Sequence, residues 1–191
     1  ARYDVSQMPV REALQRLQGE GLVTLTPNHG ASVRTFDEKF IADLYELRAE
    51  LGAVVYRDFF AALTPEVISE LECIQRRYDV AAEQNDYQSC QIENIALHQI
   101  VYSRCKNGEV ARILDMQDRL VRLLRKMAGY TPERIKAQGK EHWAIIDAIK
   151  SGDVARTIEL ARKHGLGSGA DIIARLNGRK AGRLSDFQGM D

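Results

Sequence analysis

Three of the four histidines in this 191-residue chain fall where helical periodicity places them on apolar faces. Asn94 and His98 lie four residues apart, so on a helix their side chains project from the same face. His142 and His164 fall on the apolar faces of two later predicted helices. A buried polar group without a partner costs about 1–3 kcal/mol, so these inward groups need one. Lone-pair donors on three helices are what a metal site in a bundle core requires.

We therefore predict a divalent metal bound by His98, His142 and His164, with the amide oxygen of Asn94 as a weaker fourth ligand. Imidazole suits several divalent metals; zinc is our first choice, and nickel and manganese are alternatives. The competing interpretation is a polar core pocket that holds water or an anionic ligand. His29 lies in a different kind of sequence near the start of the chain.

Residues 1–35 have a mixed pattern that differs from the rest of the chain. Ser6 can cap a helix that Gly21 is placed to end. Residues 22–26 and 31–34 favour two strands joined by a turn. The apolar residues of the helix repeat with the helical period and are expected in the core: Val10, Leu14 and Leu17. Helix followed by hairpin is the layout of the second half of a winged helix-turn-helix.

The polar face of this helix carries residues that can read DNA bases. Arg11 and Gln15 lie one turn apart, and a helix in the major groove reads guanine through Arg and adenine through Gln. His29 and Gly30 at the wing tip could approach a phosphate or the minor groove. The alternatives are an ordinary solvated helix face and, for His29, a plain turn.

Residues 36–178 predict an all-α bundle of six helices, so the fold class is mainly α. A cap or proline signal marks the start of each helix after the first: Thr64-Pro65, Asp86, Asn107-Gly108, Thr131-Pro132 and Ser151-Gly152-Asp153. Glycines at 165, 167 and 169 are expected to weaken the last helix beyond His164. We expect a flexible tail over 179–191.

Composition excludes several classes of protein. The formal net charge is zero, so the chain as a whole is not a polyanion binder. Three cysteines without CxxC spacing indicate reduced core residues of a cytoplasmic protein. No apolar run approaches the roughly 18 residues of a membrane span, so no membrane partner is expected. The chain begins at Ala1 without a methionine, in what looks like the end of a helix, and we expect the true N-terminus to be missing.

The stretch 4–17, followed by 20–23 and the wing 27–33, resembles the GntR family of bacterial transcription regulators. The rest resembles the FCD effector domain of the FadR group, and six helices rather than seven indicate the VanR-type branch. The residues that carry this second resemblance are Leu44-Tyr45-Glu46-Leu47-Arg48, Asn94, His98, Asn107, Glu141-His142, Ala148, Gly152-Asp153, Ala155 and His164.

The resemblance implies further site residues and partners. It places Ser6 and Gln7 at the start of the recognition helix, where the family often has Arg in place of Gln7. It implies a homodimer, because two-fold proteins pair with palindromic operators. The family usually has Asp, as a metal ligand, where this chain has Asn94, which would weaken the metal site. Residues 36–178 then form the effector-binding and dimerisation domain.

Arg48 falls on the apolar stripe of the first helix of the bundle, and in the family this arginine faces the effector pocket. The carboxylate of a small organic acid is therefore one candidate partner, and an internal pair with a glutamate such as Glu141 is the other. A divalent metal on neutral ligands, with Arg48 beside it, would make the pocket prefer anions. The cluster Arg122, Arg125 and Lys126 is interpreted as a solvated helix face.

The leading interpretation is a ligand-responsive, DNA-binding transcription regulator and not an enzyme. The alternative is a metal-dependent enzyme that acts on a small carboxylic acid at His98, His142 and His164. It lacks a clear general base, because Glu141 precedes His142 and so projects about 100° away around the helix. A third possibility is a DNA-binding module whose helical part only dimerises.

Overall fold

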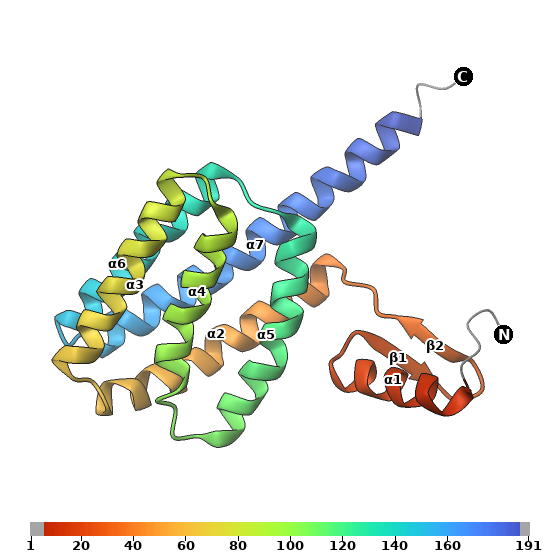
Figure 1. Ribbon diagram of the computed structural model, residues 1–191, viewed down its shortest axis with the longest axis horizontal. Helices are drawn as coiled ribbons and strands as arrows, with labels where there is room; N and C mark the ends of the chain where they lie inside the picture. The colour runs from red at the N-terminus through yellow and green to blue at the C-terminus, as the bar shows by residue number, and fades with distance from the viewer. Residues whose placement is uncertain (1–5, 188–191) are drawn as a thin grey trace.

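The computed structural model describes the backbone of residues 6–187 and the side chains of residues 6–178. Its small N-terminal part consists of α1 (Gln7–Gly19), β1 (Val23–Thr26) and β2 (Gly30–Val33). The two strands pair antiparallel, with Val23 opposite Val33. Figure 1 shows this part beside the larger helical bundle, nearest to α5. The expectations for residues 1–5 lie outside the described residues.

The described part of the bundle contains six helices, as the sequence predicted. They are α2 (Glu38–Ala61), α3 (Pro65–Glu83), α4 (Tyr87–Tyr102), α5 (Gly108–Ala128), α6 (Pro132–Lys150) and α7 (Val154–Phe187). The backbone of α7 remains helical through Gly165, Gly167 and Gly169 and enters the segment for which we expected a flexible tail. The tail itself stays a prediction.

The predicted caps start the helices where the sequence placed them. Asp86 accepts a hydrogen bond from the backbone N–H of Ser89 at 3.1 Å, and Asn107 accepts one from Val110 at 3.2 Å. The other helices after α1 begin with a side-chain acceptor in the same way: Asp37, Thr64, Thr131 and Asp153. Each cap satisfies backbone N–H groups that a helix start leaves unpaired.

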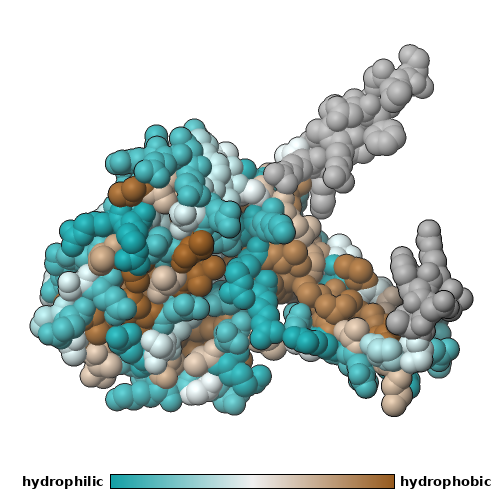
Figure 2. Space-filling view, in the orientation of Figure 1, coloured by the Kyte–Doolittle hydropathy of each residue, from teal (hydrophilic) through white to brown (hydrophobic). Residues whose placement is uncertain are grey.

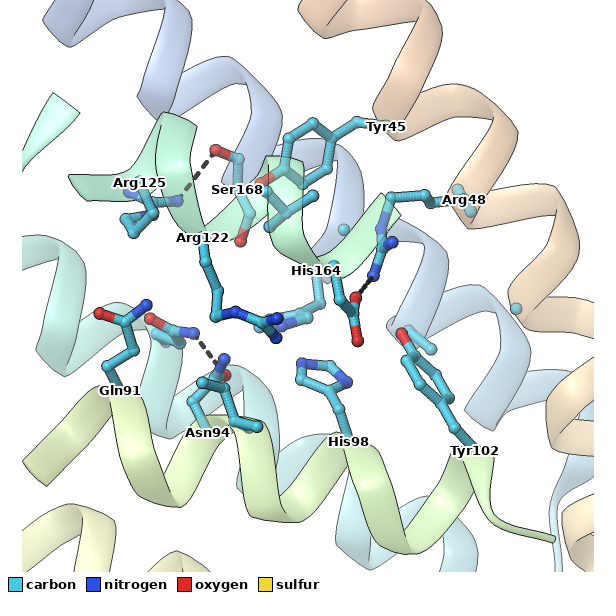
Figure 3. A pocket seen from close by; sticks show the side chains of 18 of the residues that line it. Tyr45, Arg48, Gln91, Asn94, His98, Tyr102, Arg122, Arg125, His164 and Ser168 are labelled. Carbon is cyan, nitrogen blue, oxygen red and sulfur yellow. Dashed lines mark hydrogen bonds and ion pairs between the residues drawn. The ribbon is translucent and has the colours of Figure 1, made fainter. Parts of the chain in front are cut away.

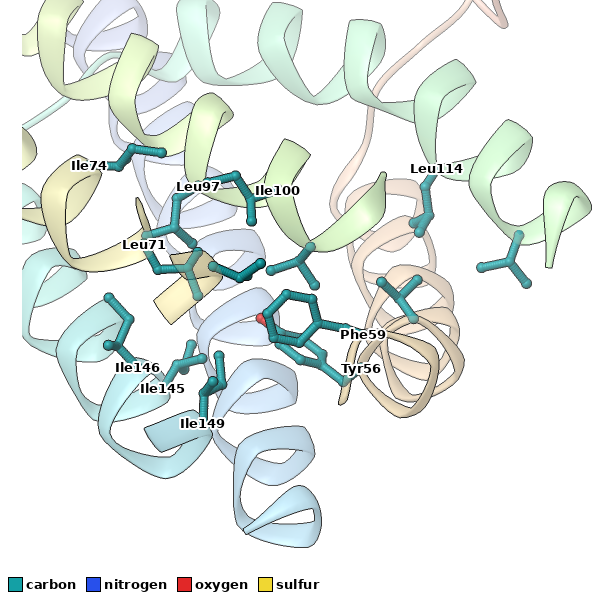
Figure 4. Close-up of a cluster of buried hydrophobic side chains, with 14 residues drawn as sticks. Tyr56, Phe59, Leu71, Ile74, Leu97, Ile100, Leu114, Ile145, Ile146 and Ile149 are labelled. Carbon is teal, nitrogen blue, oxygen red and sulfur yellow. The ribbon is translucent and has the colours of Figure 1, made fainter. Parts of the chain in front are cut away.

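Three clusters of buried apolar side chains hold the bundle together. The largest lies among α2, α3, α4, α5 and α6 and is drawn in Figure 4. A second packs α2, α5 and α7 around Ile41, Leu124 and Ile172. A third surrounds Tyr78 and Cys90. A cavity in the described structure is lined by residues from all three clusters, so it lies where they meet.

The N-terminal part is less buried than its sequence pattern implied. No residue of α1 is buried, and Val10 is 45% exposed, so the expectation that Val10, Leu14 and Leu17 pack in a core is wrong for the described residues. The hairpin covers only one side of the helix. Apolar surface gathers where this part meets the bundle (Figure 2), and there Leu22 and Phe36 pack on the α2–α5–α7 cluster. No described helix combines the length and apolarity of a membrane span.

The contact between α2 and α7 depends on a residue without a side chain. A Cβ atom on Gly169 would lie 2.8 Å from Cγ of Tyr45, closer than such atoms approach. Gly169→Ala should therefore lower the free energy of unfolding by about 1–3 kcal/mol, despite the better helix propensity of alanine. Urea unfolding at constant m-value measures the change.

Gly167→Ala is the matched control for this prediction. Gly167 lies on the same helix, and a Cβ atom there would meet no atom within 4 Å. Alanine at 167 should therefore raise stability by up to about 1 kcal/mol. If the two variants had the same stability, the close packing of α7 on Tyr45 would not be needed.

Candidate metal and ligand site

The three inward histidines meet at one point of the bundle. His98 comes from α4, His142 from α6 and His164 from α7, and one ligand nitrogen from each lies within 4.8 Å of the others. The rings of His142 and His164 are 4.9 Å apart between centroids, and His98 lies 5.7 Å from His164. The juxtaposition predicted from three separate helices is therefore present.

Hydrogen bonds turn two of these rings so that one nitrogen is left for a cation. Nδ1 of His142 lies 2.8 Å from Oε1 of Gln75, and Nδ1 of His164 lies 2.7 Å from Oε2 of Glu141. An oxygen acceptor at Nδ1 holds the ring proton there and leaves the lone pair on Nε2. Nε2 of His142 is buried and has no hydrogen-bond partner among the described residues. A buried lone pair without a donor is suited to a metal ion.

Charge states also favour ligation. Burial, followed by the charges of His164 and Arg48, lowers the pKa of His98 to about 3. Burial, followed by the charges of His164 and His98, lowers the pKa of His142. Both rings are therefore neutral at pH 7, the form that binds a metal. As the pH falls below about 6.5, the unfolded chain gains protons that these buried rings do not, so the metal-free protein loses stability.

Glu141 lies closer to the site than its position along α6 suggested. Arg134 binds both of its oxygens, at 2.7 and 3.0 Å, and His164 binds one of them. Burial raises the pKa of Glu141, but the hydrogen bonds from His164 and Arg134 outweigh it and lower the pKa to about 2. The expectation that Glu141 points away is wrong, because the approach of α7 brings His164 to it. It is a fully engaged carboxylate and not a free general base.

Asn94 lines the cavity but already has a partner. Its Oδ1 accepts a hydrogen bond from Nε2 of Gln138 at 2.7 Å. The hydroxyl of Tyr78 donates to the backbone oxygen of Ile135 at 3.0 Å and also lies 3.3 Å from Oε1 of Gln138. A carbonyl oxygen has a second lone pair, so Asn94 keeps one position for a cation. Its role as fourth ligand stays a prediction.

The cavity beside the histidines has a volume of about 140 Å³ and is rich in arginine. Arg48 lines it, as predicted, but is already paired with Asp118 at 2.5 Å and donates to the backbone oxygen of Leu114 at 3.2 Å. The proposed internal partner Glu141 is therefore wrong, because Asp118 on α5 lies nearer. Figure 3 shows Arg48 at one side of the cavity, where a dashed line marks its ion pair.

The basic cluster on α5 divides in the structure. Arg125 is buried, pairs with Asp171 at 2.5 Å and donates to the backbone oxygen of Ser168 at 3.1 Å. Its interpretation as a solvated residue is therefore wrong. Arg122 lines the cavity and reaches across it in Figure 3. The side chain of Arg122 is exposed, and among the described residues it has no hydrogen-bond or ion-pair partner. Lys126 is exposed, as expected.

These ion pairs determine which arginine gives the cavity its net positive charge. Arg48, Arg125 and Arg134 each have a carboxylate partner, so each pair is neutral overall. A fourth arginine, Arg162, pairs with Glu50. The positive charge that remains unpaired among the described lining residues belongs to Arg122, and the expectation that Arg48 supplies it is wrong. The cavity still favours an anion.

The predicted DNA-binding residues lie on the surface of the N-terminal part. Ser6 occupies the N-cap position of α1, without a side-chain capping bond. The turn between the strands reaches positive φ at Asn28 and at Gly30 (82°), where glycine is the residue best suited. The following predicted contacts are exposed: Ser6, Gln7, Arg11, Gln15, His29 and Gly30.

Two family models match the chain. The FCD domain matches residues 43–166, and the bacterial regulatory proteins of the gntR family match residues 1–33. The repressor GlaR of Escherichia coli K12 is 23% identical over 172 residues, covering 86% of this chain and 78% of GlaR. These matches cover both parts of the structure.

Solved structures share the fold at low sequence identity. E. coli McbR/YncC superposes with a TM-score of 0.71 at 18% identity, covering 92% of this chain and 84% of McbR. The FCD domain of TM0439 superposes in a metal-free form (TM-score 0.63, 22% identity, 76% and 99% covered) and in a Zn²⁺-bound form (TM-score 0.60, 22% identity, 75% and 98% covered).

Proposed function

This chain belongs to the GntR family of bacterial regulatory proteins and carries an FCD domain, and we propose that it is a metal-dependent sensor of a small organic acid that regulates transcription. The named relatives are transcription regulators, and the chain is a DNA-binding regulator rather than an enzyme. Six bundle helices support its assignment to the VanR-type branch of the FadR group. The observation that carries the proposal is the histidine triad beside a cavity with an unpaired arginine.

The donor set supports a divalent metal held by His98, His142 and His164, with Asn94 as a weaker ligand. His142 offers a buried lone pair, and the Nδ1 partners of His142 and His164 orient both rings. Zinc is the first choice because tetrahedral sites with nitrogen ligands suit it, and because the FCD domain of TM0439 binds it. When bound, the metal supplies a positive charge with open positions for an anion.

The proposed effector is a small organic acid whose carboxylate reaches the metal. Arg122, which has no partner among the described residues, offers its guanidinium to a second carboxylate or hydroxyl group, and Arg48 lines the same cavity in its pair with Asp118. Dicarboxylates and sugar acids suit such a cavity better than neutral or long-chain compounds do. A gluconate operon repressor of Bacillus subtilis, 26% identical over 169 residues, is among the relatives.

Helix α5 supports a route from the cavity to the DNA-binding part. Asp118 holds Arg48, and the next residue, Arg119, bonds Oε1 of Glu20 at 3.2 Å. Glu20 is the C-cap of α1, the proposed recognition helix. A bound acid that moves α5 would therefore shift the heads of a homodimer relative to each other and change operator affinity.

Arg11→Ala should weaken binding to the operator by about 1–3 kcal/mol, because an arginine that reads guanine loses both of its hydrogen bonds. The operator is first enriched from a random DNA pool with the wild-type chain, and we expect a palindrome. Fluorescence anisotropy then measures affinity at fixed salt concentration.

Lys39→Ala is the matched control, since Lys39 is an exposed cation on α2 outside the proposed interface. It should leave operator affinity nearly unchanged. Equal affinities for wild type and the Arg11 variant would remove Arg11 from base recognition, and a pool with no enriched sequence would contradict operator binding by this chain.

A further inference from the structure

A continuous chain of hydrogen bonds runs behind His142, away from the cavity. The indole Nε1–H of Trp143 donates to Oδ2 of Asp79 at 2.8 Å, and Nε2 of Gln75 donates to Oδ1 of Asp79 at 2.8 Å. Oε1 of Gln75 then lies 2.8 Å from Nδ1 of His142. Gln75 and Asp79 lie one turn apart on α3, whereas His142 and Trp143 are neighbours on α6.

The chemistry of these groups allows the hydrogen bonds between Trp143, Asp79, Gln75 and His142 to run in only one direction. The Asp79 carboxylate can only accept, so it must receive the amide N–H of Gln75 and the indole N–H of Trp143. The amide of Gln75 therefore presents its oxygen to His142. An oxygen at this position requires the ring proton on Nδ1, so the lone pair of His142 remains on Nε2, the atom without a partner among the described residues.

Burial excludes water as an alternative hydrogen-bond partner for Gln75 and His142. Gln75 and His142 are both 0% exposed. Gly139 on α6 makes room for the chain, because a Cβ atom there would lie 3.2 Å from Oδ1 of Asp79 and 3.6 Å from Nε2 of Gln75. A buried glutamine is costly on a helix face unless its amide is satisfied on both sides, as it is here.

We propose that Gln75 and Asp79 are positioning residues that fix the tautomer of His142 and thereby set the metal affinity of the site. The proposal rests on the metal site proposed above. If the Gln75 amide were reversed, its N–H would face Nδ1, the proton would move to Nε2, and that nitrogen could not bind a cation. Outer partners of metal-binding histidines commonly change metal affinity 10- to 100-fold.

Trp143 allows this series of hydrogen bonds to be followed by fluorescence, because it is the only tryptophan in the sequence. A cation on Nε2 polarises the Nδ1–H bond of His142 and so tightens the bonds through Gln75 to Asp79. Zinc should therefore change the fluorescence of Trp143, although the indole is not a zinc ligand.

The test compares four variants of the full chain. Asp79→Asn keeps the shape but provides one acceptor oxygen for two donors, so the orientation of Gln75 is no longer fixed. Gln75→Leu removes the acceptor without changing charge. Gln75→Glu restores an acceptor for Nδ1–H. Asp147→Asn is the matched control, since Asp147 is an exposed carboxylate on the same helix as His142.

Two readouts are needed. Competition with a chelator gives the zinc affinity, and ¹⁵N NMR of the histidine rings in the metal-free protein gives the tautomer of His142 directly. We expect Asp79→Asn and Gln75→Leu to lower zinc affinity about 10- to 100-fold and to lose the pure Nδ1–H form. Gln75→Glu should keep the Nδ1–H form of His142, because both oxygens of a carboxylate accept. Asp147→Asn changes no partner of His142 and should leave both the zinc affinity and the tautomer as in wild type.

The proposal is overturned if Asp79→Asn and Gln75→Leu leave the His142 tautomer as in wild type, or if folded variants bind zinc as tightly. Asp79→Asn still decides the matter if Gln75→Leu does not fold. A wild-type chain that binds no zinc but has the Nδ1–H form of His142, which Asp79→Asn then loses, would contradict the metal site and leave the tautomer control intact.

Discussion

His142→Ala is expected to abolish the rise in melting temperature that zinc gives to the wild-type chain. A ligand that binds only the folded state stabilises it by about 2.7 kcal/mol at a hundredfold excess over its Kd. His142 supplies a buried nitrogen, Nε2, that has no hydrogen-bond partner among the described residues. Without this ligand, two histidines and an amide oxygen remain to hold the metal. Thermal unfolding of the same variant with zinc and with a chelator separates the effect of the metal from the stability lost by removing a buried side chain.

His29→Ala is the control for this prediction, because His29 is exposed in the turn of the hairpin. It should keep the full zinc-dependent shift. Asn94→Asp should increase the shift, since a carboxylate can still accept from Gln138 and offers a charged oxygen to the metal. A wild-type chain that melts at one temperature with zinc, nickel, manganese or chelator would disprove the metal site.

Arg122→Ala is expected to lower the affinity for an organic acid about 10- to 100-fold in the zinc-loaded protein. Hydrogen bonds to charged groups contribute about 1.5–3 kcal/mol, and Arg122 is the cavity arginine that has no partner among the described residues. Calorimetric titration with citrate, a sugar acid and lactate, and with a fatty acyl compound as a negative control, measures the loss.

Other basic residues of the same region provide the controls. Lys126→Ala removes a charge from α5 outside the cavity and should leave acid affinity unchanged. Arg48→Ala should also weaken binding, because it releases the carboxylate of Asp118 toward the cavity. The double variant Arg48→Ala/Asp118→Ala should recover part of that loss. If acid affinity survived Arg122→Ala, or if the acyl compound bound preferentially, the charge of Arg122 would not be what makes the cavity bind organic acids.

The helices and their order could be predicted because each depends on local signals. Caps such as Asp86 and Asn107, followed by apolar residues at helical spacing, are visible in the sequence and start the helices in the structure. The prediction failed in α1, where periodicity indicated a buried face. Burial depends on what packs against a helix, and spacing within the helix cannot supply that.

The three histidines could be found because each lies on an apolar face of its own helix. Their outer partners could not be found in the same way. Glu141 reaches His164 across two helices, and Gln75 reaches His142 from α3, so these contacts depend on how helices cross. The available signal for Gln75 was a polar residue among the buried positions of α3.

The arginines show the same limit more clearly. Arg48, predicted to face the pocket, and Arg125, predicted to be solvated, both pair with a carboxylate, whereas Arg122 has no carboxylate partner in the described structure. Helical position placed Arg48 at the cavity but did not place Arg122 and Arg125 there. Pair formation depends on partners 46 to 70 residues away along the chain.

The central claim is that metal and acid together control DNA binding, and operator affinity in the presence and absence of each tests it most directly. Anisotropy of labelled operator DNA is measured with the full chain, zinc-loaded or chelator-treated, while citrate or a sugar acid is titrated. We predict that acid shifts the operator affinity of the zinc-loaded protein by about 5- to 150-fold, the usual range of allosteric coupling, and has little effect after chelation. An operator affinity that is the same in all four conditions would contradict the account.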